Sequence, residues 1–333
     1  MRNESSNYPI IDLHCDMLHY LATVPNSSPD NSRDIGCSIG RLEEGKVRLQ
    51  VMAISSVEKE PDVMLTHSQI VWFRRFIEEY GDNFNPVTNI IEAREILKSD
   101  KTGIMASIEN AGALCNNDES LDSAFDRLEQ IIETTGKLLY ISLTHHGESR
   151  FGGGNQTGLG LKDDGRSFLD YINNRKIAVD LSHTSDALAH DIIDYIDKRG
   201  LKIPLIASHS NYRRVFNHPR NLPDELAKEI IDRDGLIGVN FLRAFMHPDD
   251  PDYLARHILY GLRLGGEKAI CFGADYFCTN SHPDKSREPF YFEAHRHAGQ
   301  YQEILFSLKD ELDDEILKAL ANDNVIRYLN RYW

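Results

Sequence analysis

The chain has 333 residues, of which 41% are hydrophobic and 27% charged, the composition of an ordinary globular protein. No apolar run approaches the ~20 residues that a membrane helix needs, so we expect no membrane span. The formal net charge of −15 argues against binding to nucleic acid or to an anionic membrane surface, because both need a basic face on the protein.

The five cysteines are odd in number and form no C-x-x-C pair, so we expect reduced thiols. The first residues, from Met1 to Asn7, contain no apolar run of the kind found in signal peptides. We therefore predict a cytosolic protein.

Short apolar segments alternate along the chain with segments of helical periodicity. The predicted strands cover residues 10–13, 47–57, 103–108, 137–143, 176–181, 203–207, 236–241 and 269–272. The predicted helices cover residues 63–80, 90–97, 121–135, 166–175, 186–199, 223–233 and 252–264, followed by a helical tail over 290–333. Eight strands that alternate with helices predict an α/β fold, a single (β/α)8 TIM-like barrel with a C-terminal helical extension. Because composition does not change between the elements, residues 1–333 are expected to form one domain.

A glycine-rich segment, residues 147–165, follows the fourth predicted strand. Its GGGNQTGLGL run does not lie between a strand end and a helix start with the spacing of a dinucleotide-binding site. We expect a flexible active-site loop there and not a phosphate-binding loop.

Ionisable side chains follow six of the predicted strands, at the end of the barrel where active sites lie. These residues are His14, Asp16, Glu109, His145, His183, His209 and Asp275. Any one of them alone is more often a helix cap or a salt-bridge partner. Four histidines and three carboxylates together at one rim favour a metal site instead, because their mutual repulsion and desolvation would be costly without cations.

This pattern predicts a binuclear metal centre. His14 and Asp16 are two residues apart at a strand end, so their side chains point the same way and offer nitrogen and oxygen ligands to a transition metal. They can serve one ion, and His183 and His209 the other, with Glu109 as the bridge between the ions. Two ions ~3.5–4 Å apart can hold a bridging hydroxide at neutral pH and polarise a substrate carbonyl.

Seven spaced motifs resemble, in order, those of the renal (membrane) dipeptidases, which are di-zinc peptidases on a TIM-like barrel. The motifs are the opening His-x-Asp, SIENAG, SLTHH, VDLSHTS, ASHS, RNLPDE and GAD, and the match runs from His14 to about Asp275. The resemblance implies two Zn²⁺ ions per chain and a dipeptide as the substrate, and relatives are often homodimers. The zinc ligands that it implies are His14, Asp16, Glu109, His183 and His209.

The resemblance also implies substrate and catalytic roles for His145, Arg220 and Asp275. We expect Asp275 to carry the proton of the attacking water to the leaving amine, and His145 to hold the carbonyl oxygen. Arg220 would bind the terminal carboxylate of the substrate, which would restrict substrates to dipeptide length. A surface salt bridge with Asp224 is the alternative role for Arg220.

The chain departs from the family at two places. Tyr276-Phe277-Cys278 stands where relatives usually have Phe-Asp-Gly, and Asp323-Asn324 stands where they have Gly-Asn. The glycine-rich loop likewise lacks a Trp-Ala-Asp run that relatives carry. The first departure follows the catalytic carboxylate, so it bears on substrate preference more than on the chemistry.

Two other functions remain open. One is another di-metal amide, lactone or phosphoester hydrolase on the same barrel. Many such enzymes open with His-x-His and use a modified lysine as the bridge, which Asp16 and Glu109 argue against. The other is a non-catalytic metal-binding protein, in which Asp275 or His145 would be expected to be missing, and both are present.

Overall fold

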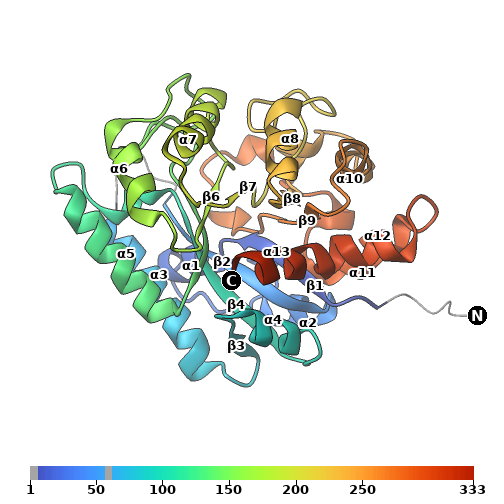
Figure 1. The fold of residues 1–333 in the computed structure, drawn as a ribbon. Coiled ribbons are helices and arrows are strands. Elements are labelled where there is room, and N and C mark those ends of the chain that lie inside the picture. Colours follow the sequence, from blue (N-terminus) through green and yellow to red (C-terminus); the bar gives the residue numbers. More distant parts are fainter. Residues whose placement is uncertain (1–6, 57–61) are drawn as a thin grey trace, which may run out of the picture.

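The computed structural model describes residues 7–56 and 62–333. Within them, eight parallel strands form the wall of a barrel (Figure 1). The strands are β1 (Ile10–Cys15), β2 (Val47–Ser55), β4 (Thr102–Glu109), β5 (Leu138–Ser142), β6 (Ala178–Asp180), β7 (Leu205–Ile206), β8 (Ile237–Val239) and β9 (Ile270–Phe272). Their order in the sheet, β7-β6-β5-β4-β2-β1-β9-β8, follows the chain, as a (β/α)8 barrel requires.

Backbone hydrogen bonds between the ends of β7 and β8 nearly close this barrel. Ala207, directly after β7, donates its N–H to Leu236 O at 2.8 Å and accepts from Gly238 N at 2.8 Å. A further strand, β3 (Phe84–Pro86), pairs with β4 outside the barrel order. The predicted TIM-like fold is therefore confirmed.

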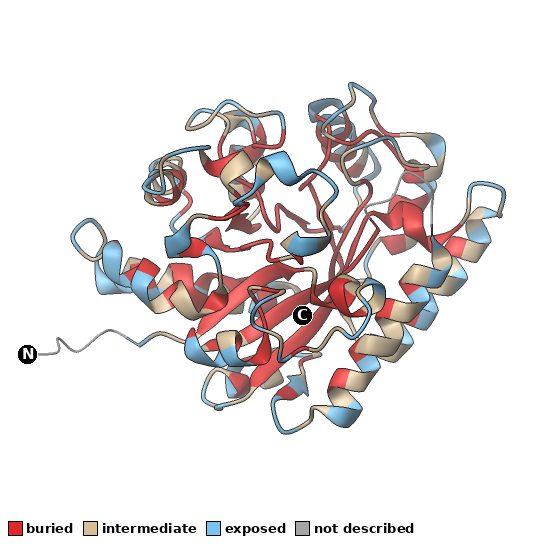
Figure 2. Cartoon of the chain, turned by 180° about the vertical axis from the view of Figure 1, so that it is seen from behind, coloured by how far each residue is buried: buried red, intermediate tan, exposed pale blue. Residues whose placement is uncertain are grey.

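Helices surround the barrel and cover the outer faces of its strands (Figure 1). They are α1 (Met17–Thr23), α2 (Ile39–Glu44), α3 (Val63–Glu79), α4 (Ile90–Ile96), α5 (Leu121–Thr135), α6 (Asp163–Ile172), α7 (Asp186–Arg199), α8 (Asp224–Asp232), α9 (Arg243–Met246), α10 (Tyr253–Arg263), α11 (Tyr301–Ser307), α12 (Asp314–Lys318) and α13 (Asn324–Tyr332). Figure 2 shows buried residues along the strands and exposed residues on the outer sides of the helices. The apolar core thus lies between the helices and the strands, and inside the barrel.

Most predicted elements are present, with corrections at their ends. Helix α6 begins three residues before its predicted start, because Asp163 and Asp164 occupy its first turn, where acidic side chains stabilise the helix dipole. The first strand extends to Cys15. Val57, the last residue of the predicted second strand, lies outside the described residues.

The predicted helical tail is wrong over residues 290–300. This stretch forms short 3-10 turns, and Ala298 donates its N–H to Gly36 O, so its backbone is used outside any helix. Regular helix begins at Tyr301. The elements α1, α2, α9 and β3 are absent from the sequence prediction, because segments of three to seven residues show too little periodicity to be recognised.

Helix α13 fills the end of the barrel at which the strands begin. Its buried side chains Tyr328 and Leu329 belong to one apolar cluster with residues of the strands, such as Ile11 on β1. Asn324, the first residue of α13, donates its side-chain N–H to Ile270 O at 2.8 Å. The helix therefore closes the barrel opposite the carboxyl ends of the strands.

Tyr328→Ala is expected to lower the free energy of unfolding by about 3–5 kcal/mol, because truncation of a buried aromatic side chain removes apolar contacts and leaves a cavity. Tyr328 is 2% exposed. Urea denaturation followed by circular dichroism measures the change. Phe306→Ala on α11 is the matched control, since Phe306 is 52% exposed and its loss should cost about 0.5 kcal/mol or less. Equal effects of the two substitutions would contradict the role assigned to α13.

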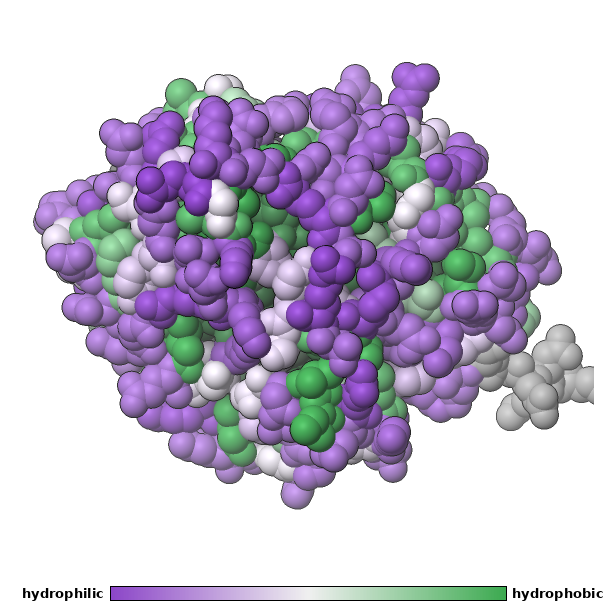
Figure 3. Space-filling view, in the orientation of Figure 1, coloured by the Kyte–Doolittle hydropathy of each residue, from purple (hydrophilic) through white to green (hydrophobic). Residues whose placement is uncertain are grey.

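The face of the molecule shown in Figure 3 is predominantly hydrophilic, with hydrophobic side chains in separate smaller areas. Such a surface agrees with the net charge of −15. Among the described residues, no helix combines the length and the apolar character needed to cross a membrane.

Candidate metal centre

The carboxyl ends of four strands bring the predicted metal ligands together. His14 lies on β1 with Asp16 directly after it, and Glu109 is the last residue of β4. His183 and His209 stand just beyond the ends of β6 and β7. The barrel thus gathers all five side chains at one place, and their role as ligands stays a prediction.

Glu109 lies between two groups of potential ligand atoms. Its Oε2 is 3.7 Å from His14 Nε2, which is in turn 3.9 Å from Asp16 Oδ2. Its Oε1 is 2.8 Å from His183 Nε2 and 3.4 Å from His209 Nε2. Within each group the ligand atoms lie within 4.8 Å of one another. Each oxygen of Glu109 therefore faces a different pair of side chains, as a carboxylate that bridges two cations must.

A buried tyrosine sets which nitrogen of His14 faces the centre. Tyr140 on β5 donates its hydroxyl to Leu13 O at 3.0 Å, so that its oxygen accepts from His14 Nδ1 at 2.6 Å. A proton on Nδ1 leaves the Nε2 lone pair directed at Glu109. Hydrogen bonds of this kind orient histidine ligands of metals.

Ser208 and Asp180 set which nitrogen of His209 faces the centre. The Ser208 hydroxyl donates to Asp180 Oδ2 and accepts from His209 Nδ1, both at 2.6 Å. His209 Nε2 is then unprotonated and faces Glu109. Asp180, Ser208 and Tyr140 are not among the residues predicted from the sequence, although Asp180 and Ser208 lie inside the VDLSHTS and ASHS motifs.

Two donor atoms of the centre lack the partners that a metal-free site would need. In the described part of the chain, His14 Nε2 and Asp16 Oδ1 are buried without a hydrogen-bond partner. Burial lowers the pKa of His183 and of His209 well below the usual value, so both imidazoles are neutral. Burial also raises the pKa of Glu109, although the charge of Arg220 acts in the opposite direction. Neutral imidazoles next to a cluster of buried carboxylates are a donor set that divalent cations bind, so these residues fit a metal centre.

Asp275 stands beside this centre, beyond the end of β9. Its Oδ1 lies 3.7 Å from His14 Nε2, and its Oδ2 accepts from Asn240 Nδ2 at 2.8 Å. Burial raises the pKa of Asp275 to about 7, although the His14 imidazole beside it acts in the opposite direction. A carboxyl group with a pKa near neutrality can both accept and return a proton.

Two adjacent histidines, His145 and His146, lie on the other side of His183. The ring centroid of His145 is 4.4 Å from that of His183, and the two neighbours are 4.1 Å apart. Burial lowers the pKa of His145 well below its usual value and that of His146 to about 4, so both are neutral at pH 7. A neutral imidazole can donate an N–H to a carbonyl oxygen. His146, which the sequence did not single out, has its Nδ1 2.8 Å from Asn155 Oδ1.

Arg220 is buried next to the centre and is 3% exposed. Its Nη1 donates to Ser210 Oγ at 2.8 Å and its Nη2 to His209 O at 2.9 Å, while its Nε has no hydrogen-bond partner among the described residues. Among the described residues, Arg220 and Asp224 form no salt bridge, and Asp224 Oδ2 accepts a hydrogen bond from the Tyr260 hydroxyl at 2.7 Å.

A cavity of about 530 Å³ opens over the centre. Its lining combines Asp16, Glu109 and Asp275 with apolar side chains that include Leu65 and Phe245. A space of this size accommodates a small ligand.

The model of one protein family, membrane dipeptidase (peptidase family M19), matches residues 3–332. The chain belongs to this family. The resemblance inferred from the seven motifs is thereby confirmed.

Curated relatives match part of this M19 chain. A protein of Acinetobacter calcoaceticus, described as an uncharacterized protein in the PQQ-III 3' region, is 29% identical over 181 residues, which cover 52% of this chain and 53% of the relative. An uncharacterized dipeptidase of Schizosaccharomyces pombe is 32% identical over 146 residues, which cover 41% of this chain and 34% of the relative. The chain spans about half the length, or less, of these curated relatives.

Solved structures share the fold over nearly the whole M19 chain. A metallo peptidase from Rhodobacter sphaeroides, liganded with a phosphinate mimic of the dipeptide L-Ala-D-Ala, has a TM-score of 0.82 at 19% identity and covers 98% of this chain and 100% of its own. The probable dipeptidase PvdM from Pseudomonas aeruginosa has a TM-score of 0.77 at 14% identity, with 96% and 94% covered. At these identities the likeness shows the fold.

The two departures from the M19 pattern lie at opposite ends of the barrel. Phe277 and Cys278 line the cavity over the centre, and Tyr276 is fully buried behind them. Asp323, the residue that replaces the glycine, ends the turn directly before α13 and pairs with Lys318 Nζ at 2.9 Å. The first departure can therefore touch a substrate, whereas the second concerns the closed end of the barrel.

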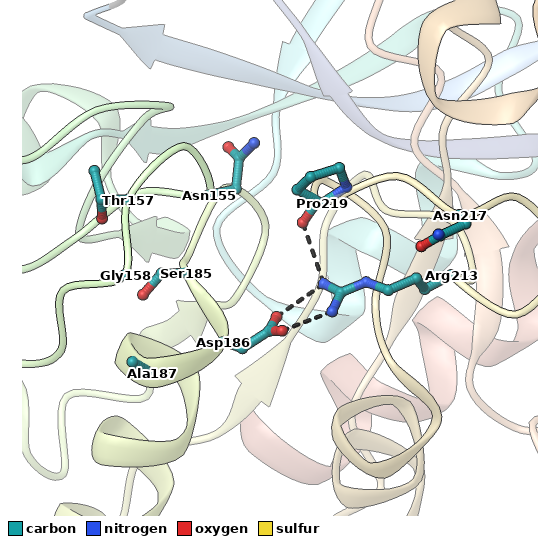
Figure 4. Close-up of a pocket in the computed structure, with 9 residues that line it drawn as sticks. All are labelled: Asn155, Thr157, Gly158, Ser185, Asp186, Ala187, Arg213, Asn217 and Pro219. Atoms are coloured by element: carbon teal, nitrogen blue, oxygen red, sulfur yellow. Dashed lines mark hydrogen bonds and ion pairs between the residues drawn. The ribbon is translucent and has the colours of Figure 1, made fainter.

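A second cavity of this M19 chain, of about 440 Å³, is drawn in Figure 4. The glycine-rich loop contributes Asn155, Thr157 and Gly158 to its lining. Arg213 donates two hydrogen bonds to Asp186, at 2.6 and 2.8 Å, which Figure 4 marks as dashed lines. The two charged residues that line this cavity, Asp186 and Arg213, thus pair with each other. The loop nevertheless reaches the site, because Asn155 also contacts His146.

Proposed function

We propose that this chain is a zinc-dependent dipeptidase, which hydrolyses the peptide bond of dipeptides. The observation that carries the proposal is the position of Glu109, whose two carboxylate oxygens face separate sets of ligand atoms. Membership of the M19 family supports the reaction. So does the phosphinate dipeptide mimic with which a relative of the same fold is liganded.

Two Zn²⁺ ions are the proposed cofactors. His14, Asp16 and Glu109 would hold one ion, and His183 and His209, together with Glu109, would hold the other. When bound, the ions supply an activated water as the nucleophile and polarise the carbonyl of the substrate.

Asp275 is the proposed proton carrier. Its Oδ1 faces the centre while Asn240 holds its Oδ2, so one oxygen is free for the reaction. It accepts the proton of the attacking water and delivers it to the nitrogen of the leaving amine. The nitrogen must be protonated as the C–N bond breaks, because an amide anion is a poor leaving group.

His145 is proposed to hold the carbonyl oxygen. It lines the cavity and is neutral, so its ring N–H can donate to the oxygen as negative charge develops there. Such a donor stabilises the transition state more than the ground state, which is the condition for catalysis.

Arg220 is proposed to bind the α-carboxylate of the substrate. Its Nε has no partner among the described residues, and its guanidinium lies 5.6 Å from the ring of Phe245, which lines the cavity. The α-carboxylate of a dipeptide lies about one residue from the scissile carbon. A fixed cation at that distance would select dipeptides over longer peptides.

The test is a panel of free dipeptides, their C-terminal amides, β-lactams, lactones and phosphotriesters, assayed with added zinc. We expect hydrolysis of the free dipeptides and a lower kcat/KM for their amides. Arg220→Ala should lower kcat/KM for free dipeptides by about 10- to 150-fold, the worth of a hydrogen bond to a charged group, and should change the amides little. The metal content of Arg220→Ala must match that of the wild type, because Arg220 also donates a hydrogen bond to the backbone oxygen of His209.

Equal rates for free and amidated dipeptides would show that the enzyme does not recognise the α-carboxylate. A lactone or phosphotriester as the best substrate would assign the chain to another class of hydrolase. A cytosolic location and a homodimer stay predictions.

A further inference from the structure

Arg287 is a cation on the wall of the metal cavity. It belongs to the short 3-10 turn Lys285–Arg287 that follows β9, and its side chain is half-buried. Among the described residues that line the cavity, it is the sole lysine or arginine. It contacts two rings, because Nη1 lies 3.4 Å from His282 Nε2 and the guanidinium lies 5.6 Å from the Phe290 ring.

The acidic residues of the same loop are engaged elsewhere. Glu288 pairs with Lys285 Nζ at 2.9 Å. Asp284 accepts hydrogen bonds from the N–H and the hydroxyl of Ser286, at 3.1 and 2.6 Å. Together with these hydrogen bonds, the charge of Arg287 helps to lower the pKa of Asp284, but Arg287 and Asp284 form no ion pair. Within the described chain, the guanidinium therefore has no carboxylate partner and keeps donors available for a ligand.

The surroundings of Arg287 leave room for a side chain of the substrate. Arg287, His146 and Phe245 line both the metal cavity and an adjoining cavity of about 270 Å³. The guanidinium thus lies where a side chain of the substrate can extend from the metal cavity into the adjoining cavity. The net charge of −15 repels anions at long range, so an anion that enters this cavity needs a local cation to hold it.

We propose that Arg287 binds a side-chain carboxylate of the substrate, so that dipeptides containing Asp or Glu are preferred. The inference rests on the proposed dipeptidase function and deepens it. A guanidinium and a carboxylate pair through two parallel hydrogen bonds, which a neutral amide cannot match. Because Arg220 is assigned to the α-carboxylate, Arg287 distinguishes substrates by a second carboxylate, on either the first or the second residue.

The test compares kcat/KM for acidic dipeptides and their neutral isosteres on the zinc-loaded enzyme. The pairs are Ala-Asp with Ala-Asn and Asp-Ala with Asn-Ala, each as the L,L and the L,D form, with Ala-Ala as the reference. We expect the wild type to prefer the acidic member of at least one pair by about tenfold. The pair that shows the preference identifies the residue whose side chain meets Arg287.

Arg287→Gln should abolish this preference and leave Ala-Ala within about twofold, while Arg287→Lys should keep part of it. Arg296→Gln is the matched control, because it removes the same charge from a side chain that is 53% exposed and paired with Glu293, and it should keep the full preference. Calorimetry with phosphinate mimics of Ala-Asp and Ala-Asn, and of Asp-Ala and Asn-Ala, gives a second readout. Arg287→Gln should weaken the acidic mimic of the preferred pair about tenfold and leave its neutral partner unchanged.

Equal rates for acidic and neutral isosteres in the wild type would overturn the inference and leave the dipeptidase assignment standing. A preference that survives Arg287→Gln would do the same. Loss of Ala-Ala hydrolysis by the same factor would assign Arg287 to the α-carboxylate instead. Failure of the zinc-loaded wild type to hydrolyse any dipeptide would overturn the proposed function, and the inference with it.

Discussion

Asp275→Asn is expected to lower kcat by about 10²–10⁴-fold, because it removes the proton acceptor and leaves the shape of the side chain unchanged. The variant still has a carbonyl oxygen to accept the hydrogen bond from Asn240 Nδ2, which holds the native carboxylate at 2.8 Å. The loss should therefore come from proton transfer and not from a displaced side chain. Steady-state kinetics on a free dipeptide with saturating zinc measure it.

Two controls accompany this substitution. Elemental analysis should find the wild-type metal content in Asp275→Asn, which separates proton transfer from metal loss. Asp186→Asn should keep kcat within about twofold, because Asp186 lies in the second cavity and pairs with Arg213 there. Near-normal turnover in a metal-replete Asp275→Asn enzyme would move the proton carrier to another group, with His145 as the next candidate.

Glu109→Gln is expected to reduce the metal content from two ions per chain to at most one. An amide presents one neutral oxygen, so it cannot bridge two cations with full charge, and the ligand atoms that now lie on either side of Glu109 would lose their shared partner. kcat/KM should fall by at least about 10²-fold, since the ions supply several kcal/mol of charge stabilisation in the transition state. Elemental analysis after dialysis against zinc at neutral pH measures the first effect.

Glu119→Gln is the matched control for this substitution. Glu119 lies in the loop after the same strand, but its carboxylate pairs with Arg127 and does not line the cavity. This variant should bind two ions and keep its activity. Two ions retained after dialysis of Glu109→Gln, or at most one ion in the wild type, would contradict the bridging role of Glu109.

The fold and the clustering of the candidate ligands were predictable because both depend on short stretches of chain. Each barrel strand is a buried apolar run, which stands out from the helical segments on either side. Residues such as Glu109 and Asp275 come at or just beyond the end of such a run, and parallel strands all end at one rim of a barrel. The identity of the candidate ligands therefore follows from the order of the residues alone.

The orientation of these side chains was decided by the tertiary structure. Tyr140 and His14 are 126 residues apart in the sequence, and Ser208 and Asp180 are 28 apart, so no local sequence pattern predicts either contact. The same holds for Arg220, for which the sequence allowed a surface salt bridge and which the closed barrel buries at the backbone of His209.

The sequence by itself determined the eight barrel strands, the longer helices and the reactive groups at the strand ends, because periodicity and strand endings are properties of neighbouring residues. Only the tertiary structure decided which oxygen of Glu109 faces which histidine, which nitrogen of His14 is protonated, and that Arg287 lines the metal cavity without forming an ion pair within the described residues. These features depend on distances between residues far apart in the chain. Such distances are fixed only when the barrel forms and its loops pack over the rim.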